Sequence, residues 1–275
     1  MTEVIGFKAA DADLKCRDHQ FEVGQTYTID GEPVHCERGF HFCQNPLDVL
    51  NYYPLVQDDG QLTRFMAVVA SGTVLTDGDK SVSAAIHVKA ELRLFEFIKS
   101  AADTVIKLCK GAANKDAAAS GNYSQLAASG YGSQLAASGY GSQLAASGDG
   151  SQLAASGNGS KLAASGYGSQ LAASGDGSQL AASGNYSQLA ASGNGSQLAA
   201  SGYGSKLAIE GINGVAISAG GNSTVMGIDG TWVSLASYDN KGACTGIATG
   251  CIGKGRLKAG KVYRAENGKF VEVKP

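Results

Sequence analysis

A nine-residue repeat occupies the middle of the chain and limits what the chain can fold into. Ten consecutive units of the form S-G-x-G-S-Q-L-A-A run from Ser120 to Ile209, and two weaker units follow through Gly227. Gly211 and Gly220 still hold the second position in these weaker units. A fixed period of this kind is typical of proteins that stack one short structural unit on the next.

The repeat fits strands better than a helix. At about 100° per residue, a nine-residue step places successive leucines on opposite sides of a helix, so no apolar stripe forms. In a strand, the leucine and the second alanine of S-Q-L-A-A share one face, and the glutamine and first alanine share the other. The S-G-x-G segment suits a corner. One strand and one corner per unit predict a β-solenoid with two strands in each coil.

The leucines predict a thin core between two opposed sheets. Each buried leucine would contribute roughly 2 kcal/mol. They are Leu126, Leu135, Leu144, Leu153, Leu162, Leu171, Leu180, Leu189, Leu198 and Leu207. A Gly/Ser-rich linker is the first alternative, but a linker needs no leucine at every ninth position. A coil of three strands is the second.

The variable third position of the unit defines two edges of the predicted solenoid. One edge carries Tyr131, Asp149, Tyr167, Asn185 and Tyr203, with Tyr186 next to Asn185; the other carries Asn122, Tyr140, Asn158, Asp176 and Asn194. We expect Asn and Asp at these corners because they tolerate left-handed backbone dihedrals. Exposed tyrosine has no such backbone role and suits protein recognition, although like residues in a ladder can also simply stack. The first edge, with Tyr186, is therefore the predicted partner-binding surface.

The other positions of the repeat argue against two ligands. Calcium-binding β-rolls carry Asp two residues before the large apolar residue, where each of the ten regular units has Ser, so calcium is not expected. An ice-binding face would need a regular lattice such as a row of Thr, and no such row is present. The outward glutamine row is expected to be a solvated face.

The two ends of the chain have ordinary globular composition. Residues 1–112 predict an α+β domain with strands at 21–27, 38–43, 66–72 and 85–94, a helix that Asn45 and Pro46 begin, and an amphipathic helix at 95–109. We expect the last helix to plug the open first coil of the solenoid, residues 113–227. Residues 228–275 predict a small β cap with strands at 231–239, 260–264 and 268–273.

The N-terminal domain holds the one group of residues suited to metal chemistry. Cys16, Cys36, His41 and Cys43 are the best four zinc ligands, and His19 stands three residues after Cys16. The spacing does not reproduce a paired C-x-x-C knuckle, and small buried thiols are the structural alternative. Otherwise no cofactor is expected. The six cysteines of the whole chain are too few for a disulfide scaffold.

Charge and hydropathy exclude further classes of function. The net charge is −2, which gives neither the basic footprint of a nucleic-acid-binding protein nor the strong acidity of a DNA mimic. No window is apolar enough to span a membrane, and the first residues lack the apolar core of a signal peptide. A cytoplasmic location is expected.

Several motifs outside the leucine pattern occur together in other proteins. They are Phe7-Lys-Ala, Phe21-Glu-Val-Gly, C-E-R-G-F-H-F-C at 36–43, N-P-L-D-V-L-N-Y-Y at 45–53, the A-x-S-G repeats and Gly230-Thr-Trp. In this combination the chain resembles, over nearly its whole length, a family of uncharacterised phage and prophage proteins. The resemblance implies a phage setting, in which small accessory proteins often neutralise a host defence protein or bind its signal.

These observations together predict a non-enzymatic β-solenoid that inhibits or sequesters a host component in the host cytoplasm. A host protein is the expected partner, and self-association into a homo-oligomer is a further expectation; a membrane and nucleic acid are not. A structural or virion-associated role is one alternative. An enzyme with a nucleotide-like substrate in the N-terminal domain, near the strand at 39–42, is the other.

Overall fold

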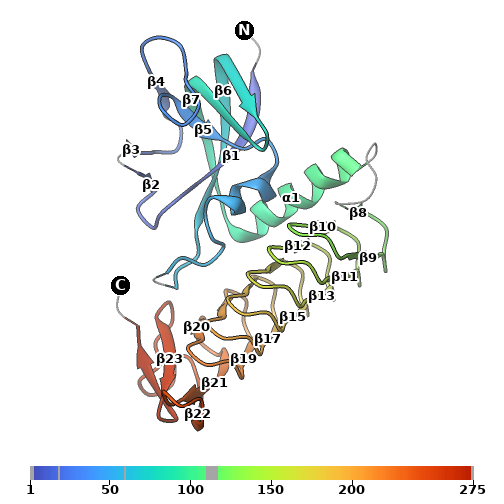
Figure 1. The fold of residues 1–275 in the computed structure, drawn as a ribbon, viewed down its shortest axis with the longest axis vertical. Coiled ribbons are helices and arrows are strands. Elements are labelled where there is room, and N and C mark those ends of the chain that lie inside the picture. The colour runs from blue at the N-terminus through green and yellow to red at the C-terminus, as the bar shows by residue number, and fades with distance from the viewer. Residues whose placement is uncertain (1–2, 18, 59, 110–116, 274–275) are drawn as a thin grey trace.

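The computed structural model describes residues 3–17, 19–58, 60–109 and 117–273. The chain is mainly β, with 48% strand and 6% helix. It forms a strand-rich N-terminal domain, a β-solenoid and a C-terminal β cap, and the N-terminal domain lies along one side of the solenoid (Figure 1). The predicted fold class is confirmed.

The solenoid makes about seven turns over residues 118–235. Each strand pairs in parallel with the strand one coil further on, as Leu135 does with Leu153 and Leu144 with Leu162. One sheet contains β8 (Ala117–Ala119), β10 (Gln134–Ala137), β12 (Gln152–Ala155), β14 (Gln170–Ala173), β16 (Gln188–Ala191), β18 (Lys206–Ile209) and β20 (Thr224–Met226). The opposed sheet contains β9 (Gln125–Ala128), β11 (Gln143–Ala146), β13 (Lys161–Ala164), β15 (Gln179–Ala182), β17 (Gln197–Ala200), β19 (Val215–Ser218) and β21 (Trp232–Tyr238). The coil therefore has two strands, as the period predicts.

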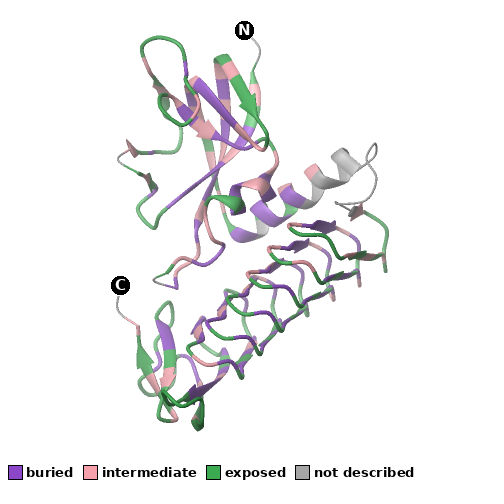
Figure 2. Cartoon of the chain, in the orientation of Figure 1, coloured by how far each residue is buried: buried purple, intermediate pink, exposed green. Residues whose placement is uncertain are grey.

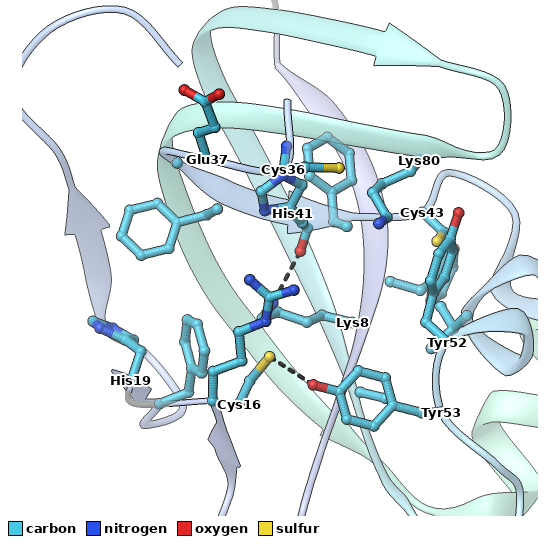
Figure 3. A pocket seen from close by; sticks show the side chains of 18 residues that line it. Lys8, Cys16, His19, Cys36, Glu37, His41, Cys43, Tyr52, Tyr53 and Lys80 are labelled. Atoms are coloured by element: carbon cyan, nitrogen blue, oxygen red, sulfur yellow. Dashed lines mark hydrogen bonds between the residues drawn. The ribbon is translucent and has the colours of Figure 1, made fainter. Parts of the chain in front are cut away.

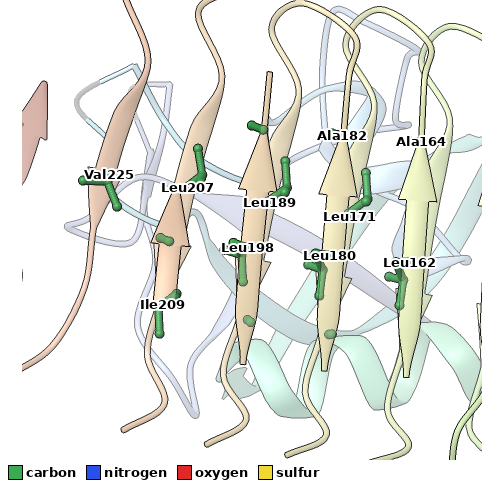
Figure 4. Close-up of a cluster of buried hydrophobic side chains, with 14 of the residues drawn as sticks. Leu162, Ala164, Leu171, Leu180, Ala182, Leu189, Leu198, Leu207, Ile209 and Val225 are labelled. Atoms are coloured by element: carbon green, nitrogen blue, oxygen red, sulfur yellow. The ribbon is translucent and has the colours of Figure 1, made fainter. Parts of the chain in front are cut away.

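The core of the solenoid is the predicted leucine ladder. Leucines from the two sheets point toward one another, and the second alanine of each unit fills the space beside them (Figure 4). Leu135, Leu171 and Leu189 are fully buried. The serine before each strand closes the corner from inside; the Ser160 hydroxyl, for example, donates to Gly157 O at 2.6 Å. Each coil is thin, so stacking on its neighbours supplies most of its stability.

The two glycines of each unit have different roles. A Cβ atom at Gly166, in the second position, would lie 2.1 Å from Gly148 O in the preceding coil, so only glycine lets the corners stack. Gly168, in the fourth position, has φ of +65° with open space around it. The left-handed residue is thus the fourth, and the expectation that Asn and Asp at the third position adopt left-handed dihedrals is wrong. None of those Asn or Asp residues has a positive φ.

The N-terminal domain is built on an antiparallel sheet in the order β1-β6-β7-β4, with β5 also paired to β7. Its strands are β1 (Val4–Ala10), β4 (Thr26–Thr28), β5 (Phe40–Phe42), β6 (Arg64–Asp77) and β7 (Lys80–Leu92), and β2 (Lys15–Cys16) and β3 (His19–Gln20) form a separate short hairpin. Asn45 caps the 3-10 helix η1 (Pro46–Asn51) by accepting from Leu47 N, with Pro46 in the first turn as predicted.

Helix α1 (Leu94–Cys109) does not plug the end of the solenoid. It lies across the outer face of β8, β10, β12 and β14 (Figure 1). Phe97 and Ile98 are buried, and they belong to the same core cluster as the outward alanines Ala136 and Ala154. Alanine leaves this sheet face flat enough for a helix, which explains why the helix covers the face instead. The amphipathic pattern of this helix also predicts that Ala102, Ile106 and Cys109 share a face with Ile98, but their side chains lie outside the described residues.

The outward glutamine row divides between two environments. On the sheet that begins with β8, this row contacts segment 45–58 of the N-terminal domain, one coil after another. The hydrogen bonds join Gln134 to Asn45, Gln152 to Asn51, Gln170 to Leu50 O and Leu55 N, Gln188 to Val56 N, and Lys206 to Asp58. This half of the row is an interdomain contact, so the expectation of a solvated face is wrong there. On the opposed sheet, Gln143, Gln179 and Lys161 are exposed. Figure 2 shows exposed and buried segments alternating along the solenoid.

The C-terminal cap ends the parallel stack with antiparallel strands. β20 pairs with β23 (Val262–Glu266), which pairs with β24 (Lys269–Glu272). On the other sheet, β21 pairs with β22 (Cys244–Cys251), a strand that the sequence did not predict. Among the described residues, no helix has the length and apolar character needed to cross a membrane.

Candidate functional site

The corners that lead from the second sheet back to the first carry a row of exposed tyrosines. Tyr131, Tyr167, Tyr186 and Tyr203 are 79%, 56%, 46% and 48% exposed. We call these four residues the tyrosine edge. All four lie on the edge that the sequence predicts, because two units make one coil and alternate corners fall on the same side.

Asp149 and Asn185 lie between these tyrosines and stabilise the stack. The Asp149 carboxylate accepts a hydrogen bond from Tyr167 N at 2.8 Å, and Asn185 Oδ1 accepts one from Tyr203 N at 2.9 Å. Each side chain thus pairs with the backbone one coil further on. We therefore assign Asp149 and Asn185, both predicted as partner-binding, a structural role that also fixes the backbone of the neighbouring tyrosines.

Three rings of the tyrosine edge pack on one another. The ring centroids of Tyr167 and Tyr186 are 5.3 Å apart, and those of Tyr186 and Tyr203 are 5.8 Å apart. Tyr186 occupies the fourth position of its unit and has φ of +58°, where most units have glycine. A bulky residue rarely adopts this conformation. Its ring covers Gly204 in the next coil, where a Cβ would lie 2.8 Å from the ring.

Tyr238 extends this edge into the C-terminal cap. It is 43% exposed, and its hydroxyl donates to Ala219 O at 2.8 Å. A Cβ atom at Gly221 would lie 3.2 Å from the Tyr238 ring and 3.5 Å from the Tyr203 ring, so the two rings flank the same glycine. Sequence reasoning missed Tyr238 because its segment no longer follows the nine-residue period.

The opposite edge has fewer tyrosines. Tyr123 and Tyr140 pack with ring centroids 5.5 Å apart at the first coils. Beyond them the corners carry Asn158, Asp176 and Asn194, whose side chains accept backbone N–H groups of the next coil. This edge therefore provides a natural comparison for the tyrosine edge.

The predicted zinc ligands lie together around a cavity of about 570 Å³ in the N-terminal domain (Figure 3). Cys16, Cys36, His41 and Cys43 all line it. Cys16 Sγ lies 2.8 Å from the Tyr53 hydroxyl, and His41 Nε2 accepts from Cys36 N at 2.9 Å. The fold thus brings the four residues to one cavity, from β2, β5 and the loops on either side of β5.

Their arrangement does not form a ligand set. Within the part of the chain that the structure describes, no group of three or more His, Cys, Asp or Glu side chains is placed to hold a metal ion. The His41 nitrogen that could bind zinc accepts the Cys36 N–H, and burial raises the pKa of the Cys43 thiol to about 12, which disfavours the thiolate. The zinc site stays a prediction, which metal analysis of the purified protein tests.

The cavity also contains positive charges that sequence reasoning missed. Lys8, Arg17 and Lys80 line it together with His41. Burial lowers the pKa of His41 to about 4, and these three cations act in the same direction. The available signal was Lys8 itself, a lysine within the otherwise apolar strand V-I-G-F-K-A-A.

Comparison with known proteins finds one family model that matches part of the chain. The domain family DUF7666, described as a domain of unknown function, matches residues 4–100. This range covers most of the N-terminal domain, including the cavity, and ends before the repeat. No curated protein and no solved structure matches the chain.

Proposed function

We propose that this chain is a non-enzymatic binding protein that holds a protein partner on its tyrosine edge. The observation that supports this is the packed run of Tyr167, Tyr186 and Tyr203, whose rings contact one another and yet stay 46–56% exposed. Side chains already ordered in the free protein lose little entropy on binding, so their contact area stabilises a complex efficiently.

The backbone under these tyrosines supports the same proposal. Tyr203 N is bound by the Asn185 side chain, and Tyr186 keeps an unfavourable left-handed conformation that glycine would adopt without strain. In a purely structural corner, Tyr186→Gly would relieve that strain. Tyr123 on the opposite edge has the same conformation, so the longer run of packed rings, and not this strain, distinguishes the tyrosine edge.

The partner we propose is a host protein in the host cytoplasm, which the chain inhibits or sequesters. This part rests on the resemblance of the sequence to phage and prophage proteins. The geometry of the edge adds that the partner presents an elongated groove or strand, since the tyrosines follow one line along the solenoid.

The test uses substitutions that the repeat itself contains. Tyr167→Asn, Tyr186→Gly and Tyr203→Asn together remove the three rings and introduce only residues found at the same positions of other units. The matched control, Tyr123→Gly with Tyr140→Asn, makes the same changes on the opposite edge. A partner isolated from host extract with the parent protein is then titrated against both variants.

We expect the triple variant to bind that partner at least about tenfold more weakly, because each buried tyrosine contributes about 1–2 kcal/mol. The control should bind like the parent. Equal affinity of all three proteins would contradict the proposal. Loss of self-association without loss of the partner would instead assign the edge to contacts between copies of this chain.

A further inference from the structure

The buried lysine of strand β1 has no carboxylate partner among the described residues, and the acidic group beside it is the Cys16 thiol. Lys8 is 8% exposed, and its ammonium donates to the His41 carbonyl at 3.0 Å. No carboxylate of residues 3–17, 19–58, 60–109 or 117–273 lies within 4.0 Å of it. An ammonium taken out of water without a counter-ion is strongly unfavourable. Burial accordingly lowers the pKa of Lys8, the Cys16 thiol acts in the opposite direction, and a bound anion would further favour the charged form.

Two further cations line the same cavity. Arg17 and Lys80 face it with Lys8, and Glu37 is the one carboxylate among the lining residues that the structure describes. The Glu37 side chain points away from Lys8 (Figure 3). Arg17 also has φ of +55°, a strained conformation of the kind that accumulates at binding sites. Among the described lining residues, three cations stand against one carboxylate, and Asp79 lies behind the lining residue Tyr52; this balance of charge favours an anion.

The other side chains that line the cavity favour an anion that carries an aromatic ring. Phe7, Phe21, Phe40 and Phe42 line the cavity, and Lys8 Nζ lies 5.1 Å from the centre of the Phe21 ring. His19 Nε2, from the same lining, is buried without a hydrogen-bond partner among the described residues. A volume of about 570 Å³ is larger than inorganic phosphate requires and falls in the range of small-molecule sites.

We propose that this cavity binds a small aromatic phosphomonoester of the nucleoside monophosphate class. Lys8, Arg17 and Lys80 contact the phosphate, since clustered ammonium and guanidinium groups suit a dianion. The planar ring packs against the phenylalanine walls, and a polar edge of the ring pairs with His19 Nε2. This site is separate from the tyrosine edge and does not depend on the function proposed for that edge.

The experiment measures binding by titration calorimetry with the full chain. The probes are AMP, GMP, CMP and UMP, their four nucleosides, and inorganic phosphate. We expect at least one nucleotide to bind at least about tenfold more tightly than both its nucleoside and phosphate alone, with an affinity that falls as salt is added. If none of the four does so, the proposal is wrong.

Three variants locate the binding. Lys8→Met keeps the apolar stem and should weaken nucleotide binding at least about tenfold without changing nucleoside binding. Lys80→Met changes a half-buried side chain and should weaken nucleotide binding severalfold. If Lys8→Met does not fold, Lys80→Met decides the test. Lys89→Met, at an exposed position of the same domain, is the matched control. Nucleotide binding that is unchanged in Lys80→Met and in a folded Lys8→Met would overturn the assignment of the site.

Discussion

Asp176 Oδ1 accepts a hydrogen bond from Asn194 N at 2.7 Å, one coil further along the solenoid. The same relationship recurs at Asn158 and Asn185, so the third position of the unit joins one coil to the next. An Asn or Asp side chain at a corner thus adds to the backbone hydrogen bonds between coils, such as the one that Gly177 N donates to Asn194 O.

This relationship predicts the effect of two substitutions at one site. Asp176→Asn keeps an acceptor for Asn194 N and should change the free energy of unfolding by less than about 0.5 kcal/mol. Asp176→Ala removes the acceptor and should cost about 1 kcal/mol. Urea denaturation measures both. Equal stability of the two variants would show that the side-chain hydrogen bond does not stabilise the stack.

The two glycines of one corner should differ sharply in tolerance. Gly166→Ala places a methyl group against Gly148 O and should cost about 3 kcal/mol or more, because the backbone of the stack must move. Gly168→Asn should cost about 1 kcal/mol or less, since Asn213 and Asn222 adopt the same left-handed conformation. Thermal unfolding of the two variants checks the order; the reverse order would contradict the stacking described above.

Removal of whole coils tests the two-strand coil. Deletion of residues 138–155 removes one coil and leaves every later strand on its own sheet, so the protein should fold with native-like circular dichroism. Deletion of residues 147–155 moves all later strands to the opposite sheet, so the strands that carry Gln170, Gln188 and Lys206 no longer face the N-terminal domain. It should unfold at a clearly lower temperature. Equal melting of the two deletion proteins would contradict the two-sheet register.

The lowered pKa of His41 predicts that the free energy of unfolding depends on pH. Its pKa is lowered to about 4 in the folded chain, whereas an unfolded histidine titrates near 6.5. The folded state therefore favours the neutral ring. The contribution of this preference to the free energy of unfolding is complete above about pH 6.5 and is lost as the pH falls toward 4. Because His41 is only half-buried, we expect a loss of about 1–2 kcal/mol.

His41→Gln is the variant that isolates this effect. Glutamine offers an acceptor to Cys36 N but does not titrate, so the urea midpoint of the variant should fall less between pH 7 and pH 4 than that of the parent. Parallel curves for the two proteins would show that His41 does not titrate on unfolding as described.

The sequence predicted the solenoid because the pattern within each nine-residue unit is enough to determine the structure of that unit. Leucine at every ninth position determines the strand, the face and the core, and alternate units determine the edge on which Tyr167 and Tyr203 lie. It could not predict which half of the glutamine row is covered, since Gln134 and Gln143 have identical local sequences. Only the docking of the segment that begins at Asn45 distinguishes them.

The candidate sites differ in the same way: one follows from the local sequence pattern, and the other depends on contacts between distant segments. The tyrosine edge followed from periodicity, whereas Tyr238, which extends that edge into the cap, lies where the period has ended. The sequence anticipated the cavity as a group of Cys and His residues and, in one alternative, as a region near residues 39–42 for a nucleotide-like substrate, but not its positive charge. Its charge depends on Lys8, Arg17 and Lys80, which come from three separate segments and meet through the antiparallel pairing of the N-terminal sheet and its hairpin.

Photo-crosslinking from single corners tests the central claim most directly. Benzoylphenylalanine replaces tyrosine at position 167 in one protein and at position 140 in a second, and each is irradiated in host extract. Both positions are exposed corners of the solenoid and differ in the edge that carries them. We predict a discrete crosslinked partner from position 167 and none from position 140. Equal crosslinking from both positions, or none from position 167, would contradict a partner-binding tyrosine edge.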